Sequence, residues 1–191
     1  MKDSPFPSEG SGTSDVLGFS ETRLKDGQVA RLRLATPDDA AAVTAFVNVV
    51  GGERRFVLRE RATWSLEEEQ KTLGTADGRE SAFFLGEVGG RLVGLLNIGR
   101  GRWPKNRHVA EFGMSCHPDF RRLGVGTALL NRALTWAQSV GVQKVTLEVF
   151  SSNAPAIALY LRMGFVEEGR RFREFLIEDE LVDGILMARW L

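Results

Sequence analysis

The chain has 191 residues, of which 43% are hydrophobic and 26% are charged, and its 25 basic residues balance its 25 acidic ones. This length suits one domain with a full hydrophobic core, and the composition excludes a chain that is disordered throughout, a collagen-like repeat and a fibrous architecture. A net charge of zero gives no global attraction to nucleic acid or to an anionic membrane, so such binding would need a local patch.

The N-terminal residues differ in composition from the rest of the chain. From Met1 to about Leu24 the sequence is dominated by Ser, Gly, Pro, Thr and acidic residues, with only isolated apolar ones. This composition predicts a mobile tail over residues 1–25, followed by one folded domain over residues 26–191.

Apolar periodicity and turn residues predict the elements of this domain. In chain order we expect a strand over 29–34, helices over 37–50 and 65–74, strands over 82–85, 91–98 and 109–116, a helix over 126–140, a strand over 145–150, a helix over 154–163, and strands over 165–168 and 184–190. The early strands follow one another as a hairpin, whereas the later ones alternate with helices. The expected fold class is α/β (α+β), with a mixed, mostly antiparallel sheet of about seven strands flanked by helices.

The stretch Cys116-His-Pro-Asp-Phe-Arg-Arg-Leu-Gly-Val-Gly-Thr127 lies between a predicted strand and a predicted helix. Gly124 and Gly126 fall at the helix N-terminus, where backbone N–H groups and the helix dipole favour a phosphate and missing side chains allow close approach. Spacing argues against two other phosphate loops, because a dinucleotide fingerprint needs glycine where Leu129 stands and a Walker loop needs Lys after the glycines. The two glycines alone are equally compatible with tight packing of the helix.

These residues resemble the GNAT superfamily of acetyl-CoA-dependent N-acetyltransferases. Arg121-Arg-Leu-Gly-Val-Gly126 is similar to the family motif Gln/Arg-x-x-Gly-x-Gly/Ala, and it stands at the expected place between a central strand and its helix. The segment Asn153-Ala-Pro-Ala-Ile-Ala-Leu-Tyr160-Leu-Arg-Met-Gly164-Phe165 looks like a second family segment. The likeness covers about Val29 to Trp190. It implies an acyltransferase that moves an acetyl group from acetyl-CoA to a primary amine of a small molecule or of a protein N-terminus, by direct attack in a ternary complex.

The resemblance also implies a cofactor-binding surface. The backbone of the strand end would pair with the pantetheine arm, and an N–H there, above all that of Cys116, would polarise the thioester carbonyl. The turn would hold the pyrophosphate on its backbone, with added charge from two arginines. The residues implied are Met114, Ser115, Cys116, Arg121, Arg122, Leu123, Gly124, Val125, Gly126, Thr127 and Asn153, the last of which is also a good helix cap.

Tyr160, the only tyrosine of the chain, is implied as the general acid for the departing thiolate, and its alternative is a tyrosine that only packs in the core. A base must remove a proton, because most alkylamines are protonated at neutral pH. Glu111 is the first candidate, since strict alternation puts it on one strand face with Gly113 and Ser115; an exposed or ion-paired glutamate is the alternative. Glu148 in the next strand and a water relay are the remaining candidates.

Cys116 is the only cysteine, and the chain has two histidines. One cysteine forms no intrachain disulfide, and so few ligand residues do not make the usual zinc sites, so we expect no metal. A covalent acetyl-enzyme would need a base beside Cys116, but His117 points the opposite way along a strand. A small buried residue is the stronger interpretation of Cys116.

The acceptor amine should be selected by the less patterned segments, which are residues 52–64, residues 99–108 and the chain after Gly169. The acidic Glu178–Glu180 would attract a cationic amine, and Arg170–Arg173 would suit RNA or the coenzyme's phosphates, although both are typical of a solvated hairpin. Among family members the likeness is closest to those that acetylate ribosomal-protein N-termini or small polyamines, and it does not select between them.

Two other functions stay open at this point. One is a non-catalytic acyl-CoA-binding or regulatory module of the same fold, and the other is an RNA- or ribosome-associated protein, although nucleic acid is the weaker expectation. The sequence shows neither the apolar run of a secretory signal nor the roughly 18 uninterrupted apolar residues of a membrane span. We therefore expect a cytoplasmic protein with no membrane partner, and a homodimer is compatible with this interpretation.

Overall fold

The computed structural model describes residues 18–191, which form one eight-stranded sheet with helices on both faces. The strands are β1 (Ser20–Arg23), β2 (Val29–Leu34), β3 (Ser81–Val88), β4 (Arg91–Arg100), β5 (Val109–Cys116), β6 (Lys144–Phe150), β7 (Val166–Ile177) and β8 (Glu180–Trp190), in the order β1-β2-β3-β4-β5-β6-β8-β7. Every neighbouring pair is antiparallel except β5 and β6, which are parallel. The predicted mixed, mostly antiparallel sheet is confirmed, with one strand more than expected.

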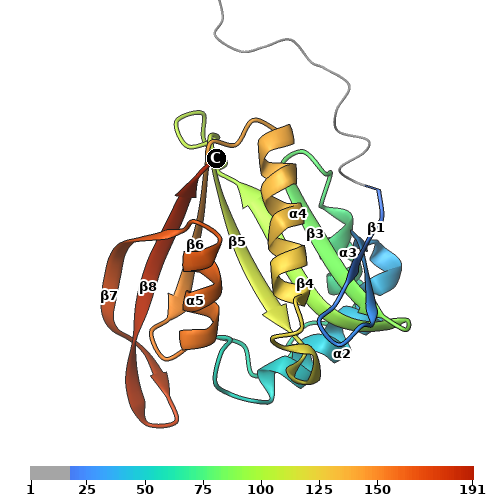
Figure 1. Ribbon diagram of the computed structural model, residues 1–191, viewed down its shortest axis with the longest axis horizontal. Coiled ribbons are helices and arrows are strands. Elements are labelled where there is room, and N and C mark those ends of the chain that lie inside the picture. The colour runs from blue at the N-terminus through green and yellow to red at the C-terminus, as the bar shows by residue number, and fades with distance from the viewer. Residues whose placement is uncertain (1–17) are drawn as a thin grey trace, which may run out of the picture.

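The four α-helices lie close to the positions that periodicity predicts. They are α2 (Ala40–Gly51), α3 (Leu66–Gly74), α4 (Val125–Ser139) and α5 (Ala154–Arg162), with short 3-10 helices η1 (Pro37–Asp39) and η2 (Pro118–Phe120). Figure 1 shows α4 and α5 in front of the sheet and α2 and α3 behind it. Within residues 18–191, no helix has the length and apolar character needed to cross a membrane.

The main core lies between the sheet and α4. Leu129, Leu130 and Ala133 of α4 are fully buried in a cluster that also contains Ala110 and Phe112 of β5. Side chains alternate along a strand, so Glu111, which lies between Ala110 and Phe112, points to the opposite face of the sheet. Helix α2 packs on that face.

A smaller core fills that opposite face. It is formed by Ala40 and Val43 of α2, Leu73 of α3 and Leu85 of β3. The two cores give the sheet two distinct surfaces, which we call the α4 face and the α2 face.

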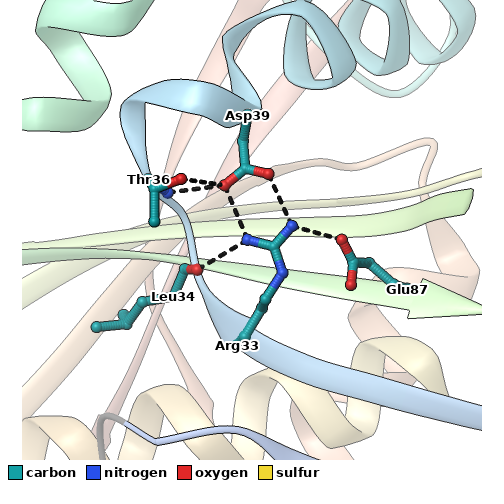
Figure 2. A network of polar contacts seen from close by, with 5 residues as sticks. All are labelled: Arg33, Leu34, Thr36, Asp39 and Glu87. Atoms are coloured by element: carbon teal, nitrogen blue, oxygen red, sulfur yellow. Dashed lines mark hydrogen bonds and ion pairs between the residues drawn. The ribbon is translucent and has the colours of Figure 1, made fainter. Parts of the chain in front are cut away.

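An ion-pair network fixes the start of α2 to the sheet (Figure 2). Arg33 of β2 donates to both carboxylate oxygens of Asp39, at 2.8 and 2.7 Å, and to Glu87 of β3 at 2.5 Å. The hydrogen bonds from Arg33 hold the pKa of Asp39 below its usual range. The network thereby ties the residue before α2 to β2 and β3.

The residues before β2 differ from the sequence prediction, which placed them in the tail. Ser20–Arg23 pair with β2 as strand β1, Leu24 is buried in the main core, and the N–H of Lys25 donates to the carbonyl of Leu123 at 2.9 Å. A four-residue edge strand offers too little periodicity to be recognised from sequence. The remainder of the predicted tail, residues 1–17, lies outside the described residues.

The C-terminal hairpin is also longer than predicted, since β7 and β8 extend over Val166–Ile177 and Glu180–Trp190. Two register shifts interrupt the pairing of β7, between Glu167 and Gly169 and between Arg171 and Phe175. Such bulges break the alternation from which a strand is predicted. The edge position of β7 leaves most of its side chains exposed, which also removes the apolar signal.

Candidate active site

Strands β5 and β6 run together over a short distance and then separate. Three residue pairs join them, from Val109–Lys144 to Glu111–Thr146, and beyond these β5 pairs only with β4 and β6 only with β8. Figure 1 shows the two strands close together near the top of the view and diverging towards the bottom. The backbone of β5 beyond Glu111 therefore has no strand partner on its β6 side.

A cavity of about 740 Å³ lies where the strands separate, a volume in the range of small-molecule sites. Its walls come from both faces of the sheet. On the α4 face they include the turn before α4 and one side of α5; on the α2 face they include residues 56–58, Glu148 and Phe175. We call these the cofactor wall and the acceptor wall, after the roles expected for those segments from the sequence.

The cavity brings together most residues implied by the sequence motifs. Those that line it are Met114, Ser115, Cys116, Arg121, Arg122, Gly124, Gly126, Thr127, Asn153 and Tyr160. Leu123 and Val125 do not line it, because their side chains pack against the main core. If these two residues contribute to a phosphate site, they do so through the backbone.

Two glycines shape the turn before α4 for different reasons. Gly124, the residue before α4, has a φ of 113°, a conformation that L-residues rarely adopt. A Cβ on Gly126 would lie 3.3 Å from Leu159 Cδ2 and 3.4 Å from Met114 Cε. Glycine at position 126 therefore allows close packing of the helix, as the packing interpretation expects. Glycine at position 124 is needed for the backbone conformation that leaves the helix N-terminus open to the cavity.

Arg121 connects the two walls. Its guanidinium forms a two-point ion pair with Glu53, which follows α2, with 2.9 Å between Nη1 and Oε1. Its Nε donates to the Cys116 carbonyl at 3.2 Å, and its charge lies 5.3 Å from the centre of the Phe56 ring. Because Glu53 already neutralises this charge, the expected phosphate role of Arg121 stays a prediction.

Lys25 lines the cavity, although its place in the sequence does not predict this. The turn between β1 and β2 packs on the loop before α4, and Lys25 lines the cavity there together with Arg122. Neither cation forms an ion pair with another described residue, in contrast to Arg121. The only sequence signal for this placement is the apolar Leu24, which anchors the turn in the core.

Tyr160 lies on α5 and is 6% exposed. Its ring packs edge-on against Phe112, with 5.8 Å between the ring centres. Burial, with a smaller contribution from nearby Cys116, raises the pKa of Tyr160 well above its usual range. The structure shows the packing interpretation of Tyr160, and the phenol keeps its proton at neutral pH. Its role as a general acid stays a prediction.

Cys116 ends β5 and lines the cavity. Burial raises the pKa of the Cys116 thiol to about 11, so the nucleophilic thiolate is scarce at neutral pH. His117 does not line the cavity, and its Nε2 lies 2.7 Å from an Arg91 nitrogen. Burial, followed by the charge of Arg91, lowers the pKa of His117. The structure supports a packing role for this cysteine rather than a Cys–His pair.

The two candidate glutamates lie on the same face of the sheet but differ in position. Glu111 is exposed, pairs with Thr146 in the last pair that joins β5 and β6, and does not line the cavity. Glu148 lies two residues beyond that pair and lines the cavity. Its Oε2 accepts from Arg171 at 2.9 Å, whereas its Oε1 is buried and has no hydrogen-bond partner among the described residues.

A glycine makes room for this carboxylate. A Cβ on Gly184 of β8 would lie only 2.1 Å from Glu148 Oε1 and 3.1 Å from the Phe175 ring. The absence of a side chain at Gly184 thus permits the observed position of Glu148. Within residues 18–191, no group of three or more His, Cys, Asp or Glu side chains is arranged to hold a metal ion.

Comparison with known proteins links this geometry to a family. The protein-family model described as "Acetyltransferase (GNAT) family" matches residues 53–165 of this chain. This span contains the turn before α4 and the whole of α5. The acetyltransferase of GNAT family from Streptococcus pneumoniae, a solved structure, matches with a TM-score of 0.81 and 29% identity, covering 85% of this chain and 99% of that one.

Curated relatives are similar over shorter spans. The L-amino acid N-acetyltransferase AaaT of Escherichia coli is 35% identical over 103 residues, which are 53% of this chain and 64% of that protein. The N-alpha-acetyltransferase of Sulfurisphaera tokodaii is 36% identical over 121 residues, which are 57% of this chain and 69% of that protein. The similarity thus spans about two thirds of each relative's length.

Proposed function

The chain belongs to the GNAT family of acetyltransferases, and we propose that it transfers the acetyl group of acetyl-CoA to a primary amine by direct attack of the amine. The observation that carries this proposal is the cavity between β5 and β6. It combines a phosphate-type turn, a free strand edge, a buried tyrosine and a carboxylate with an unpartnered oxygen. A donor of this kind also fits the cytoplasmic location expected from the sequence.

The cofactor wall suits the phosphates of coenzyme A in charge and in backbone donors. The N-terminus of α4 offers backbone N–H groups, and Lys25 and Arg122 add positive charge beside it. We assign the pyrophosphate to the backbone of residues 122–127, and the pantetheine arm to the edge of Met114–Cys116 and to Asn153. Acetyl-CoA, when bound, supplies a thioester whose acetyl carbon an amine can attack.

The free edge of β5 presents a suitable N–H for the acetyl carbonyl. The N–H of His117 donates to Val93 on the β4 side at 2.9 Å. Because successive N–H groups of a strand point to opposite edges, the N–H of Cys116 points to the β6 side, where β5 has no strand partner. This N–H would stabilise negative charge that develops on the carbonyl oxygen.

Two side chains would move the protons. Tyr160 holds its proton at neutral pH and would give it to the departing sulfur. Glu148 would take a proton from the amine, directly or through water, because it is the one carboxylate among the described residues that line the cavity. We therefore favour Glu148 over Glu111 as the base.

The proposal is tested by incubating the purified chain with acetyl-CoA and a panel of amines while thiol release and acetylated product are measured. We expect thiol release that depends on the amine. Tight binding of acetyl-CoA with no product from any amine would instead favour the non-catalytic acyl-CoA-binding module.

The choice of base is tested with a matched pair of variants. Glu148→Gln should lower kcat about 100-fold, the usual scale for loss of a general base, whereas Glu111→Gln should change kcat less than about twofold. The opposite ranking would return the role to Glu111. The melting temperatures of both variants report whether either change disturbs the fold.

A further inference from the structure

The acceptor wall is mostly apolar. Its apolar members, which come from α2 and the segment after it and from β4, β6 and β7, are Val50, Phe56, Val57, Leu58, Leu95, Phe150 and Phe175. Phe150 and Phe175 pack against each other with 4.6 Å between ring centres. An apolar group next to the reacting amine would gain free energy by leaving water for this wall.

This wall carries a single acidic group, Glu148, among the described residues that line the cavity. Only its Oε1 lacks a partner, because its Oε2 is engaged by Arg171. That oxygen is buried beside Gly184, so it would have to turn toward the cavity to accept from an amine, and the wall offers one carboxylate for one amine. A second ammonium group, as in a polyamine, would have to lose its water against apolar side chains without a counter-charge, which is costly.

The acidic residues Glu178–Glu180, which the sequence pattern offers for attracting a cation, lie away from the cavity. Glu178 and Asp179 form the turn between β7 and β8, Glu180 begins β8, and none of the three lines the cavity. The structure thus offers no second carboxylate to a polyamine at this site among residues 18–191.

Among the residues that the structure describes, the acceptor wall also offers no free cation to a substrate carboxylate. Arg121 is paired with Glu53, while Lys25 and Arg122 lie at the turn before α4, on the cofactor wall. Arg162, the remaining cationic residue that lines the cavity, is the last residue of α5 on that same wall.

The basic residues that follow α2 do not line the cavity either. Arg54 pairs with Glu60 at 3.2 Å, and the charges of Arg55 and Arg59 lie over the rings of Phe56 and Trp64. A carboxylate directly beside the reacting amine would therefore be buried without a partner.

On these grounds we infer that the acceptor is a single amine next to a large apolar group, with no free carboxylate beside the amine. The amino terminus of a peptide whose first residue is large and apolar has this chemistry; a free amino acid and a polyamine do not. The inference rests on the proposed function, and it names the substrate class of the same site.

The experiment compares kcat/KM for L-phenylalaninamide, L-phenylalanine, glycinamide and spermidine at saturating acetyl-CoA. We expect phenylalaninamide to exceed each of the other three by about tenfold or more, the scale of one well-buried apolar group or one unpaired buried charge. Equal or better turnover of phenylalanine or spermidine would overturn the inference while leaving the proposed acetyl transfer intact. Silence with all four amines and with peptides would overturn both.

A matched pair of variants tests the wall itself. Phe175→Ala should lower kcat/KM for phenylalaninamide about tenfold more than it lowers kcat/KM for glycinamide. Phe172→Ala is the control, because Phe172 lies on the same strand, is 77% exposed and does not line the cavity. Phe175→Leu should recover most of the loss. Equal losses for phenylalaninamide and glycinamide, or equal effects of the two alanine variants, would contradict the assignment.

Discussion

The two walls of the cavity are built in opposite ways. The cofactor wall comes mainly from two continuous stretches, the end of β5 with the turn before α4, and α5, and much of what it offers is backbone. The acceptor wall is made of side chains from α2 and its following segment, β4, β6 and β7, with one glycine of β8 behind them.

The difference shows how one fold can keep its donor and change its acceptor. Backbone N–H groups are supplied by any residue that preserves the turn, so the cofactor wall depends on conformation. The acceptor wall depends on the size and charge of individual side chains, which can change without altering the sheet. We therefore expect substitutions in the two walls to separate donor binding from acceptor turnover.

The largest effect should come from the turn before α4. Gly124→Asp forces an L-residue into a φ of 113° and places a negative charge beside the proposed pyrophosphate site, so affinity for acetyl-CoA should fall about 100-fold or more. Calorimetric titration measures this loss. Gly141→Asp, at the other end of α4 with a φ of 77°, controls for conformational strain; unchanged affinity in Gly124→Asp would remove the pyrophosphate assignment.

Tyr160→Phe should act on the chemical step. Removal of the hydroxyl should lower kcat about 100-fold with little change in affinity for acetyl-CoA, since a general acid acts in the transition state. Steady-state kinetics together with acetyl-CoA titration separate the two quantities. A variant with full kcat would show that this tyrosine serves only the packing seen against Phe112.

Gly184→Ala should act on the acceptor wall alone. The new Cβ would displace the Glu148 carboxylate, which is the end of a flexible side chain, so we expect about tenfold slower turnover with a nearly unchanged melting temperature. Gly169→Ala is a matched control on the neighbouring strand, because its Cβ would make an ordinary contact of 3.7 Å with Leu186. Full activity in both variants would count against Glu148 as the base.

The smallest effect should come from Lys25→Ala, which removes one charge from the cofactor wall. We expect the Kd for acetyl-CoA to rise about fivefold, as for one exposed charge-assisted hydrogen bond, and the difference from the unchanged chain to shrink at high salt. Lys71→Ala, on α3 and outside the cavity, serves as the control. A loss that does not depend on salt would argue for a disturbed turn rather than a lost charge.

The sequence was informative where structure and chemistry are local. Helix periodicity predicted the four α-helices, and the spacing of Gly124 and Gly126 predicted the turn before α4. The sequence did not predict β1 or much of β7. In these strands an edge position and bulges remove the alternation of apolar and polar residues.

The choice between Glu111 and Glu148 could not be made from the sequence either. Alternation puts both on the α2 face, and what separates them is the place at which β5 and β6 stop pairing. That place, like the packing of Lys25 on the loop before α4, is decided by contacts between residues far apart in the chain.

The unpaired edge of β5 has a consequence for how long the protein lasts in a cell. If the amide groups of acetyl-CoA bind that edge, they form hydrogen bonds that only the folded chain can make. Bound acetyl-CoA would then raise the free energy of unfolding by mass action. At a concentration of about 100 times its Kd, acetyl-CoA would contribute about 2.7 kcal/mol. The enzyme's resistance to heat and proteolysis would then follow the supply of its own donor, and a fall in acetyl-CoA would shorten its lifetime as well as slow its turnover.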